Sequence, residues 1–216
     1  MRVVLTGTGQ GRLERGLRAE GFDVLRCPLV AIEPLPGPPV PADGYDWLVL
    51  TSRNAVEALF ARLSGPLPSV AVVGPGTAEA LRRRGVEPAI VAAESTQEGL
   101  VRELPAPTGR VLFVGAEGAR DVLVRELGAD FVALYRTVEL EVEVPEADVV
   151  VLASPSAARA LARARRDLSC VSIGPVTSAE ARRLGLEVAA EARTHDGEGL
   201  LAAVKLAASP RDSSRS

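Results

Sequence analysis

The sequence predicts an α/β protein built from two similar doubly wound, flavodoxin-like domains with parallel sheets. Two observations predict this class. Short apolar runs are separated by Ala-, Leu-, Arg- and Glu-rich stretches of about 10–15 residues, the size of helices that cross over between parallel strands. In addition, one part of the chain repeats another in a permuted order.

Apolar runs that are short and continuous are predicted to be strands. They lie at 2–6, 22–27, 46–51, 69–73, 88–91, 110–114, 131–135, 148–152, 169–173 and 187–190. Because these runs are apolar on both faces, helices are expected to cover both sides of each sheet. The stretches between them are rich in good helix formers.

The repeat is visible without gaps over long segments. SVAVVGPGTAEALRRRGVEPA at 69–89 aligns with SCVSIGPVTSAEARRLGLEVA at 169–189. Upstream, VLTSRNAVEAL at 49–59 matches VLASPSAARAL at 151–161. The two regions therefore fold into similar units.

The end of the second copy is found at the start of the chain. In the first copy the repeat continues with RVLFVGAEGAR at 110–120, and its counterpart is RVVLTGTGQGR at 2–12. The second unit is thus predicted to be a circular permutation of the first. One domain comprises 1–30 plus 148–207, and the other comprises 45–136.

Two linkers, 31–44 and 137–147, connect the predicted domains. The first contains the proline-rich segment 34–41, which is expected to be stiff and extended. The second contains VELEVEVP at 138–145, whose strict alternation of apolar residues and Glu predicts a half-exposed strand paired with 30–34. Two crossings between similar domains predict a hinge with a cleft.

Composition excludes several classes of function. The net charge of −3 provides no basic field for nucleic acid or an anionic membrane. No apolar run is long enough for a spanning helix, and the N-terminus lacks a signal peptide's apolar region. Cys27, Cys170 and His195 are too few for a disulfide framework or a metal centre. We expect a cytoplasmic, metal-free protein with a disordered tail at 208–216.

Familiar catalytic motifs are absent from the sequence. GTGQGR at 7–12 has Arg12 where a dinucleotide fingerprint needs its third glycine, and it is interpreted as a turn. There is no phosphate-binding loop, and no HExxH, GxSxG or CxxC occurs. A Ser–His–Asp triad would need His195, which is interpreted as a loop residue at a helix start. A catalytic lysine would have to be Lys205.

The polar residues that remain follow the strands, where doubly wound sheets bind ligands. Glycine and hydroxyl residues there let backbone N–H groups approach an anion. The candidate contacts are Thr6, Ser52, Arg53, Asn54, Gly74, Thr77, Ser95, Gly115, Ser154, Ser156, Gly174 and Thr177. Helix capping is the alternative role for each of the hydroxyl and amide residues.

In their order, several of these segments resemble the uroporphyrinogen-III synthase family. They are VLTSRNAVEAL, AVVGPGTAEALRRRG, STQEGL, ALYRTV, VLASPSAARAL and SIGPVTSAEARRLG, and the resemblance extends from residue 1 to about 205. One departure is Thr6-Gly7-Thr8, where many members carry Thr-Arg-Pro, so an N-terminal arginine contact is not expected.

The resemblance implies an enzyme that needs no cofactor. Family members cyclise hydroxymethylbilane, an octacarboxylate linear tetrapyrrole, to uroporphyrinogen III in porphyrin and haem biosynthesis. Loss of the hydroxymethyl oxygen as water gives an azafulvene, and ring D attacks it through a spiro intermediate and becomes inverted. The resemblance also implies a monomer, with the upstream bilane-forming enzyme as a potential partner.

A tyrosine of the family aligns with Tyr135 in ALYRTV, and the resemblance implies that it assists departure of the hydroxyl as a weak acid. A rim tyrosine that packs on the linker is the alternative. Thr77 and Thr177 also match family positions near the cleft.

Two other functions fit the same architecture. A non-enzymatic small-molecule sensor with a fold like the periplasmic binding proteins would also use two hinged α/β lobes. A nucleotide-dependent enzyme is a third option, but it would lack a phosphate loop. The products formed from hydroxymethylbilane separate the three.

Overall fold

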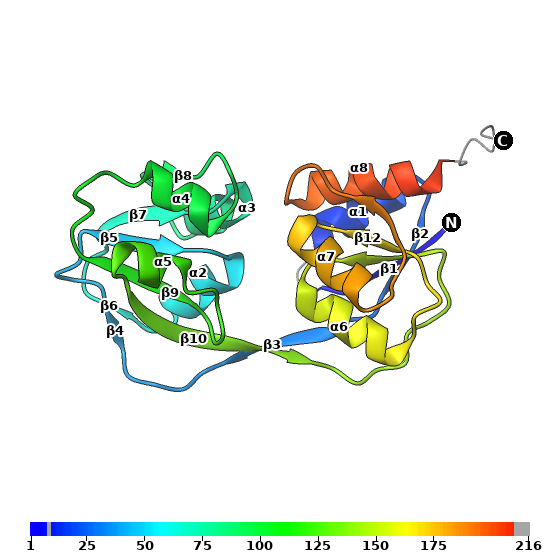
Figure 1. The fold of residues 1–216 in the computed structure, drawn as a ribbon, viewed down its shortest axis with the longest axis horizontal. Coiled ribbons are helices and arrows are strands. Elements are labelled where there is room, and N and C mark those ends of the chain that lie inside the picture. The colour runs from blue at the N-terminus through cyan, green and yellow to red at the C-terminus, as the bar shows by residue number, and fades with distance from the viewer. Residues whose placement is uncertain (8–9, 210–216) are drawn as a thin grey trace. The chain divides into compact units, whose positions relative to one another are not determined.

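The computed structural model of this chain describes residues 1–7 and 10–209 (Figure 1). These residues form two compact units. Unit 1 comprises Met1–Ala31 and the residues from Val138 onward, and unit 2 comprises Ile32–Thr137. The chain therefore leaves unit 1 once, builds unit 2 and returns. Each predicted linker is divided between the two units.

Unit 1 is organised around a five-stranded parallel sheet. Its strands are β1 (Arg2–Leu5), β2 (Asp23–Arg26), β11 (Val149–Leu152), β12 (Cys170–Ser172) and β13 (Val188–Glu191). Their order in the sheet is β2-β1-β11-β12-β13, and every neighbouring pair is parallel. Counted along the chain, this is the 2-1-3-4-5 order of flavodoxin-like sheets.

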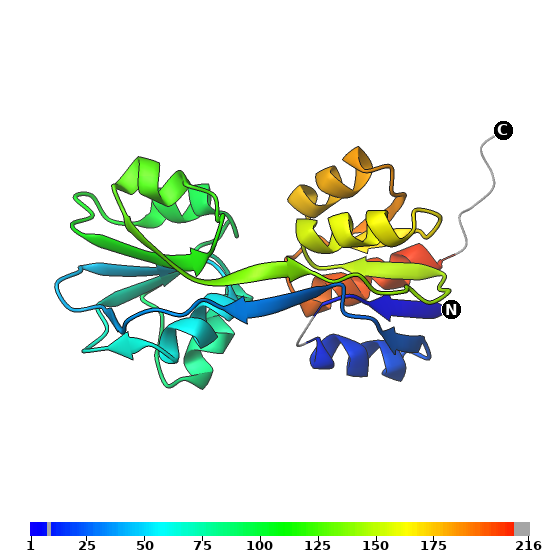
Figure 2. The same ribbon diagram turned by 90° about the horizontal axis from the view of Figure 1, so that it is seen from below.

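Helices cover both faces of this sheet. They are α1 (Gly11–Ala19), α6 (Pro155–Ala164), α7 (Pro175–Arg183) and α8 (Gly197–Ala208). Val3 and Leu5 of β1 belong to the core under α1 and α8, whereas Val4 belongs to the core under α6 and α7. Figure 2 shows α1 and α6 on opposite sides of the sheet. Alternate residues of one apolar strand thus serve two cores.

Unit 2 contains a six-stranded sheet. Its strands are β3 (Val30–Pro34), β5 (Trp47–Leu50), β7 (Ser69–Val72), β8 (Ile90–Val91), β9 (Val111–Ala116) and β10 (Asp130–Glu139), in the order β3-β10-β9-β5-β7-β8. The five strands from β10 to β8 are parallel. The edge strand β3 runs antiparallel to β10, because Leu35 N–H donates to Leu134 O, whereas Leu140 N–H donates to Leu29 O.

The second sheet is also covered on both faces. Its helices are α2 (Arg53–Phe60), α3 (Pro75–Arg83), α4 (Gln97–Glu103) and α5 (Val122–Leu127). Leu48 and Leu50 pack with α2 and α3, whereas Val49 packs with α4 and α5. No helix in the described part of the chain is both long and apolar enough to span a membrane.

The sheet orders confirm the circular permutation. The series β10-β9-β5-β7-β8 in unit 2 occupies the same places as β2-β1-β11-β12-β13 in unit 1. β9 and β1 carry the weakest sequence match of the repeat, and both lie beside the strand that follows the chain crossing. The N-terminal segment therefore completes unit 1 as the repeat predicts.

Three details differ from the sequence prediction. β10 is one strand of ten residues, Asp130–Glu139, and no strand covers 140–145, because the ladder with the β3 segment ends at the Leu140–Leu29 hydrogen bond. A small pair, β4 (Val40–Pro41) with β6 (Leu63–Ser64), was not predicted. In the expected tail, Ala208 is helical, and 210–216 lie outside the described residues.

Candidate functional site at the carboxyl edges of the two sheets

The carboxyl edge of each sheet gathers the loops that follow the parallel strands. In unit 2 the switch point of the winding lies between β5 and β9, whose following helices α2 and α5 pack on opposite faces. In unit 1 it lies between β11 and β1, followed by α6 and α1. Open α/β sheets bind ligands at such points, so each of these edges is a candidate site.

Four helices at these edges begin with a side-chain cap. Ser52 Oγ accepts from Ala55 N–H at 3.0 Å, and Ser154 Oγ accepts from Ala157 N–H at 3.2 Å. Thr96 and Asp196 accept in the same way from the N–H groups of Gly99 and Gly199. The capping role is therefore confirmed for Ser52 and Ser154, although a capping oxygen keeps further hydrogen-bonding capacity.

Gly74 and Gly174 begin α3 and α7 without a side-chain cap. A Cβ added at Gly74 would lie 2.7 Å from Ser95 Oγ, and one at Gly174 would lie 2.6 Å from His195 Nε2. Both glycines have an extended backbone, so the reason for glycine is space. Each unit thus places one polar side chain directly against a helix N-terminus, Ser95 in unit 2 and His195 in unit 1.

Thr77 and Thr177 lie in the first turns of α3 and α7, three residues after these glycines. They are 6% and 3% exposed. Neither is the capping residue of its helix, since Gly74 and Gly174 occupy that position. The capping interpretation of these two threonines is therefore wrong, and their role as ligand contacts stays a prediction.

Tyr135 lies within β10, opposite Ala116 at the carboxyl end of β9. It is only 5% exposed and packs in the core with α2. Its Oη lies 2.7 Å from Ser52 Oγ. Burial raises the pKa of the Tyr135 phenol above its ordinary value, and the hydrogen bond with Ser52 partly offsets this. The phenol is therefore protonated at neutral pH.

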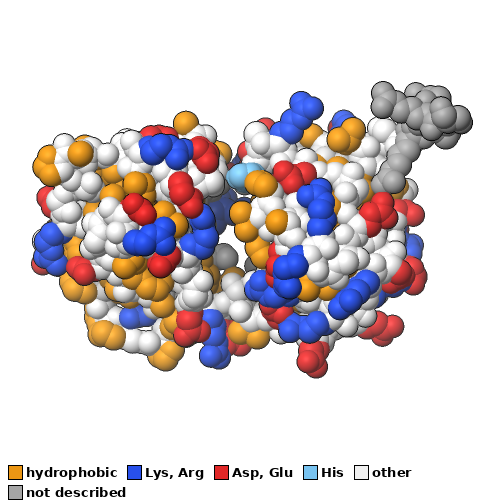
Figure 3. Space-filling model, in the orientation of Figure 1, with side chains coloured by type: hydrophobic (Ala, Val, Ile, Leu, Met, Phe, Trp, Pro, Cys, Tyr) orange, Lys and Arg blue, Asp and Glu red, His pale blue; other side chains and the backbone are white. Residues whose placement is uncertain are grey.

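Arg53 supplies a cationic group beside this pair. It is the first residue of α2, is exposed, and its Cδ lies 3.9 Å from where a Cβ would stand on Gly76 in α3. Within residues 1–7 and 10–209 its guanidinium has no ion pair or hydrogen bond. On the face that Figure 3 shows, basic and acidic side chains are mixed over the surface. Asn54 follows Arg53 and is half-buried.

Three further predicted residues have contacts within their own unit. Thr6 is fully buried, and its hydroxyl donates to Val151 O at 2.6 Å. Gly115 is buried in β9, where a Cβ would lie 3.2 Å from the Phe113 ring. Ser156 Oγ accepts from Arg159 at 3.0 Å and helps to hold that side chain. A role of Thr6, Gly115 and Ser156 as ligand contacts stays a prediction.

Arg159 is the centre of a charged cluster that the sequence analysis missed. Its guanidinium donates to Glu139 at 2.7 Å and to Glu180 at 3.3 Å, and Arg163 and Arg183 complete the cluster. Hydrogen bonds from Arg183 and Arg159 lower the pKa of Glu180 to about 2. The cluster ties the end of β10 to α6 and α7. Because these three elements are separate in the sequence, no local signal reveals it.

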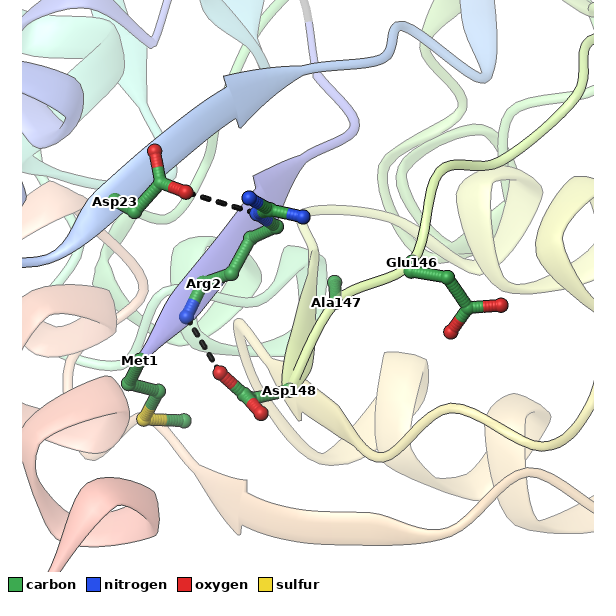
Figure 4. Close-up of a pocket in the computed structure, with 6 residues that line it drawn as sticks. All are labelled: Met1, Arg2, Asp23, Glu146, Ala147 and Asp148. Carbon is green, nitrogen blue, oxygen red and sulfur yellow. Dashed lines mark hydrogen bonds and ion pairs between the residues drawn. The ribbon is translucent and has the colours of Figure 1, made fainter.

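A separate cavity of about 420 Å³ lies at the amino edge of unit 1 (Figure 4). Its polar groups are largely paired with one another: Arg2 Nε donates to Asp23 at 2.8 Å, and Arg2 N–H donates to Asp148 at 2.6 Å. These bonds join β1 to β2 and to Asp148, the residue that precedes β11. The cavity lies at the opposite end of the strands from the candidate site.

Two doubly wound units with polar carboxyl edges define a two-domain α/β protein of the ligand-binding or enzymatic kind. Comparison with known families makes this specific. The model of the family described as uroporphyrinogen-III synthase HemD matches residues 11–202, and the chain belongs to this family.

Individual relatives agree with this membership. The chain is 35% identical over 128 residues to a uroporphyrinogen-III synthase of Synechococcus elongatus, a match that covers 51% of this chain and 48% of that protein. The chain spans about half the length of the curated relatives it matches.

Solved structures share the fold over nearly the whole chain. A mutant uroporphyrinogen III synthase from the extremely thermophilic bacterium Thermus thermophilus superposes with a TM-score of 0.63 at 20% identity, covering 96% of this chain and 98% of that one. Uroporphyrinogen-III synthetase from Helicobacter pylori gives 0.66 at 17% identity, covering 95% and 99%. At this identity the likeness shows the α/β fold with two parallel-sheet domains.

Proposed function

We propose that this protein is a uroporphyrinogen-III synthase, a cyclising hydro-lyase that converts hydroxymethylbilane to uroporphyrinogen III with inversion of ring D and loss of water. The observation that carries the proposal is family membership over residues 11–202. The carboxyl edges support it, because their groups suit an octacarboxylate substrate and a reaction that begins with loss of a hydroxyl.

Carboxylate binding is assigned to the helix N-termini and to Arg53. The free N–H groups at the starts of α2 and α3 in unit 2 and of α6, α7 and α8 in unit 1 face carboxyl edges. Each helix terminus contributes about 0.3–1 kcal/mol to a nearby anion. Several such contacts hold a polyanion without a strongly basic protein, in agreement with the net charge of −3.

The chemical step is assigned to the Ser52–Tyr135 pair. A protonated phenol coupled to a serine hydroxyl is a weak acid, which suits a hydroxyl that departs as water. The azafulvene then accepts ring D through its substituted carbon, and the spiro intermediate fragments and recloses. Holding the flexible tetrapyrrole so that this carbon attacks is catalysis by positioning.

Freshly generated hydroxymethylbilane provides the test, with uroporphyrin isomers separated after oxidation. The proposal predicts type III with the native protein and type I, the spontaneous product, with heat-denatured protein. Type I from both samples would contradict it. If, in addition, an equimolar amount of the protein protected the bilane from closure, the protein would be interpreted as a small-molecule sensor and not as an enzyme.

The setting of this reaction is also part of the proposal. We assign it to the cytoplasm and to a monomer, with the bilane-forming enzyme as the protein partner that an unstable substrate favours. Gel filtration of the protein by itself tests the monomer, and gel filtration of its mixture with the bilane-forming enzyme tests the association of the two.

A further inference from the structure

The hydrogen bonds around Ser52 limit the directions in which its proton can point. Ser52 Oγ accepts from Ala55 N–H at 3.0 Å as the cap of α2, and it lies 2.7 Å from Tyr135 Oη. A serine hydroxyl has two acceptor sites and one proton. If Tyr135 donates, both acceptor sites are filled and the serine proton has to point away from the tyrosine and the helix.

Exposure shows which member of the pair a substrate can reach. Tyr135 is 5% exposed and packs in the core of unit 2, whereas Ser52 is only part-buried at the N-terminus of α2. The Ser52 hydroxyl therefore lies between the phenol and the carboxyl edge. Arg53, whose guanidinium is unpaired among the described residues, follows directly and marks the same edge as the side that receives an anion.

We infer that Ser52 is the catalytic residue that contacts the departing hydroxyl, and that Tyr135 is a positioning residue acting through it. This assignment rests on the proposed function. The order of contact is substrate, Ser52, Tyr135, so the phenol supplies the proton without touching the substrate.

The proton transfers balance along this chain. The C–O bond of the hydroxymethyl group breaks, and its electron pair leaves with oxygen, which takes the Ser52 proton and becomes water. Ser52 takes the proton of Tyr135, which becomes a phenolate beside the cationic azafulvene. The substituted ring D carbon that forms the spiro intermediate carries no proton. When this intermediate fragments and recloses, the ring D carbon that forms the final bond loses its proton, and that proton restores the phenol through Ser52.

A spectroscopic experiment tests the direction of the hydrogen bond without activity. The chain has two tyrosines, so in Tyr45→Phe protein the Raman Fermi doublet of tyrosine comes from Tyr135 alone. Its intensity ratio differs between a phenol that donates and one that accepts. We expect the donor signature, and its loss in Tyr45→Phe/Ser52→Ala. An acceptor signature in the protein that retains Ser52 overturns the assignment.

A double-mutant cycle tests the order of contact. Ser52→Ala is expected to lower kcat by at least about tenfold. General-acid catalysis typically contributes at least about 10²-fold to a rate, and a water molecule in place of the serine hydroxyl would recover part of this. Adding Tyr135→Phe to Ser52→Ala is expected to lower it less than twofold further, because the phenol acts only through Ser52. Multiplicative effects, or Ser52→Ala with more than half the native kcat, overturn the inference.

Two further variants separate catalysis from helix capping. Ser154→Ala removes the equivalent cap in unit 1, where no tyrosine is bonded to the serine, and its loss of stability measures the cost of a cap alone. Ser52→Thr retains a hydroxyl and is expected to restore kcat to within about fivefold of native, a threshold set at ~1 kcal/mol of barrier. Failure of Ser52→Thr, with the native fold and helix content retained, counts against the assignment.

The proposed function is judged separately. If the native protein yields only type I product, the synthase proposal fails, while the Raman signature still reports the Ser52–Tyr135 geometry. If type III forms and the cycle is multiplicative, the synthase proposal stands and the order of contact is wrong.

Discussion

Gly199 approaches the backbone of Thr194 so closely that a Cβ on Gly199 would lie 2.1 Å from the Thr194 carbonyl oxygen. The repeat has the same relationship in unit 2, where a Cβ on Gly99 would lie 2.3 Å from Glu94 O. Both glycines belong to an EGL segment that occurs at 98–100 and again at 198–200, and both N–H groups donate to the capping side chain of their helix. The recurring glycine therefore has a steric cause.

Gly199→Ala is expected to lower the free energy of unfolding by about 1–3 kcal/mol, because a backbone carbonyl has to move. Denaturant titration followed by circular dichroism measures this. Gly197→Ala in the same helix is the control: its Cβ would meet nothing closer than Leu13 Cβ at 3.9 Å. The control should be neutral or stabilising by up to about 1 kcal/mol. Equal effects of the two substitutions would refute the steric explanation.

Arg53→Ala is expected to raise KM for hydroxymethylbilane roughly two- to fivefold with little change in kcat. This increase in KM corresponds to the free energy of one exposed ion pair. The matched control is Arg82→Ala in the last turn of α3, where the arginine is already paired with Glu87. The control should leave KM unchanged. Steady-state kinetics at two salt concentrations would show the Arg53 effect shrinking at high salt. A kcat effect alone would contradict a binding role.

Acid should remove the contribution of Glu180 to stability. Arg183 and Arg159 lower its pKa from 4.5 to about 2 in the folded protein. A lowered folded-state pKa stabilises the protein above the unfolded-state value, and this stabilisation is lost as the pH falls through the folded-state value. The difference in unfolding free energy between native protein and Glu180→Gln should be constant above about pH 5 and shrink towards pH 2. A pH-independent difference would show that the carboxylate is not held in this way.

Tyr135→Phe is expected to fold normally, to yield mainly type III product and to turn over at least tenfold more slowly, equivalent to roughly 1.4 kcal/mol of barrier. Positioning of the tetrapyrrole survives the loss of the phenol, so the isomer is retained while the rate falls. Single-turnover kinetics with isomer analysis checks both. An unchanged rate would leave Tyr135 as a packing residue only.

The sequence predicts the order of the strands better than it predicts side-chain roles. Continuous apolar runs and the repeat lead to two permuted sheets, because burial of a strand on both faces leaves a direct pattern. The length of β10 could not be predicted, since β10 is extended by pairing with β3 about 100 residues away. The alternation at 138–145 resembles a strand, but within the described residues the strand there does not extend beyond Glu139, and Val144 O accepts from the Arg165 side chain instead.

At the site, local rules identify Ser52 and Ser154 as capping residues, but long-range contacts decide the rest. The bond between Ser52 and Tyr135 joins residues 83 apart. Thr6 is a hydroxyl residue at a strand end, as expected for a ligand contact, yet its hydroxyl donates to Val151 O. Arg53 lies at the N-terminus of α2 directly after the capping serine, and among the described residues its guanidinium has no ion pair, which a sequence does not show.

The fraction of type III product as a function of protein concentration tests the central claim most directly, because enzymatic and spontaneous closure compete for the same bilane. With the bilane held constant, we predict that the type III fraction rises from the buffer value towards unity as native protein is added. The Ser52→Ala curve should be displaced to at least about tenfold higher protein concentration. A type III fraction that stays at the buffer value at every concentration of native protein would contradict the account.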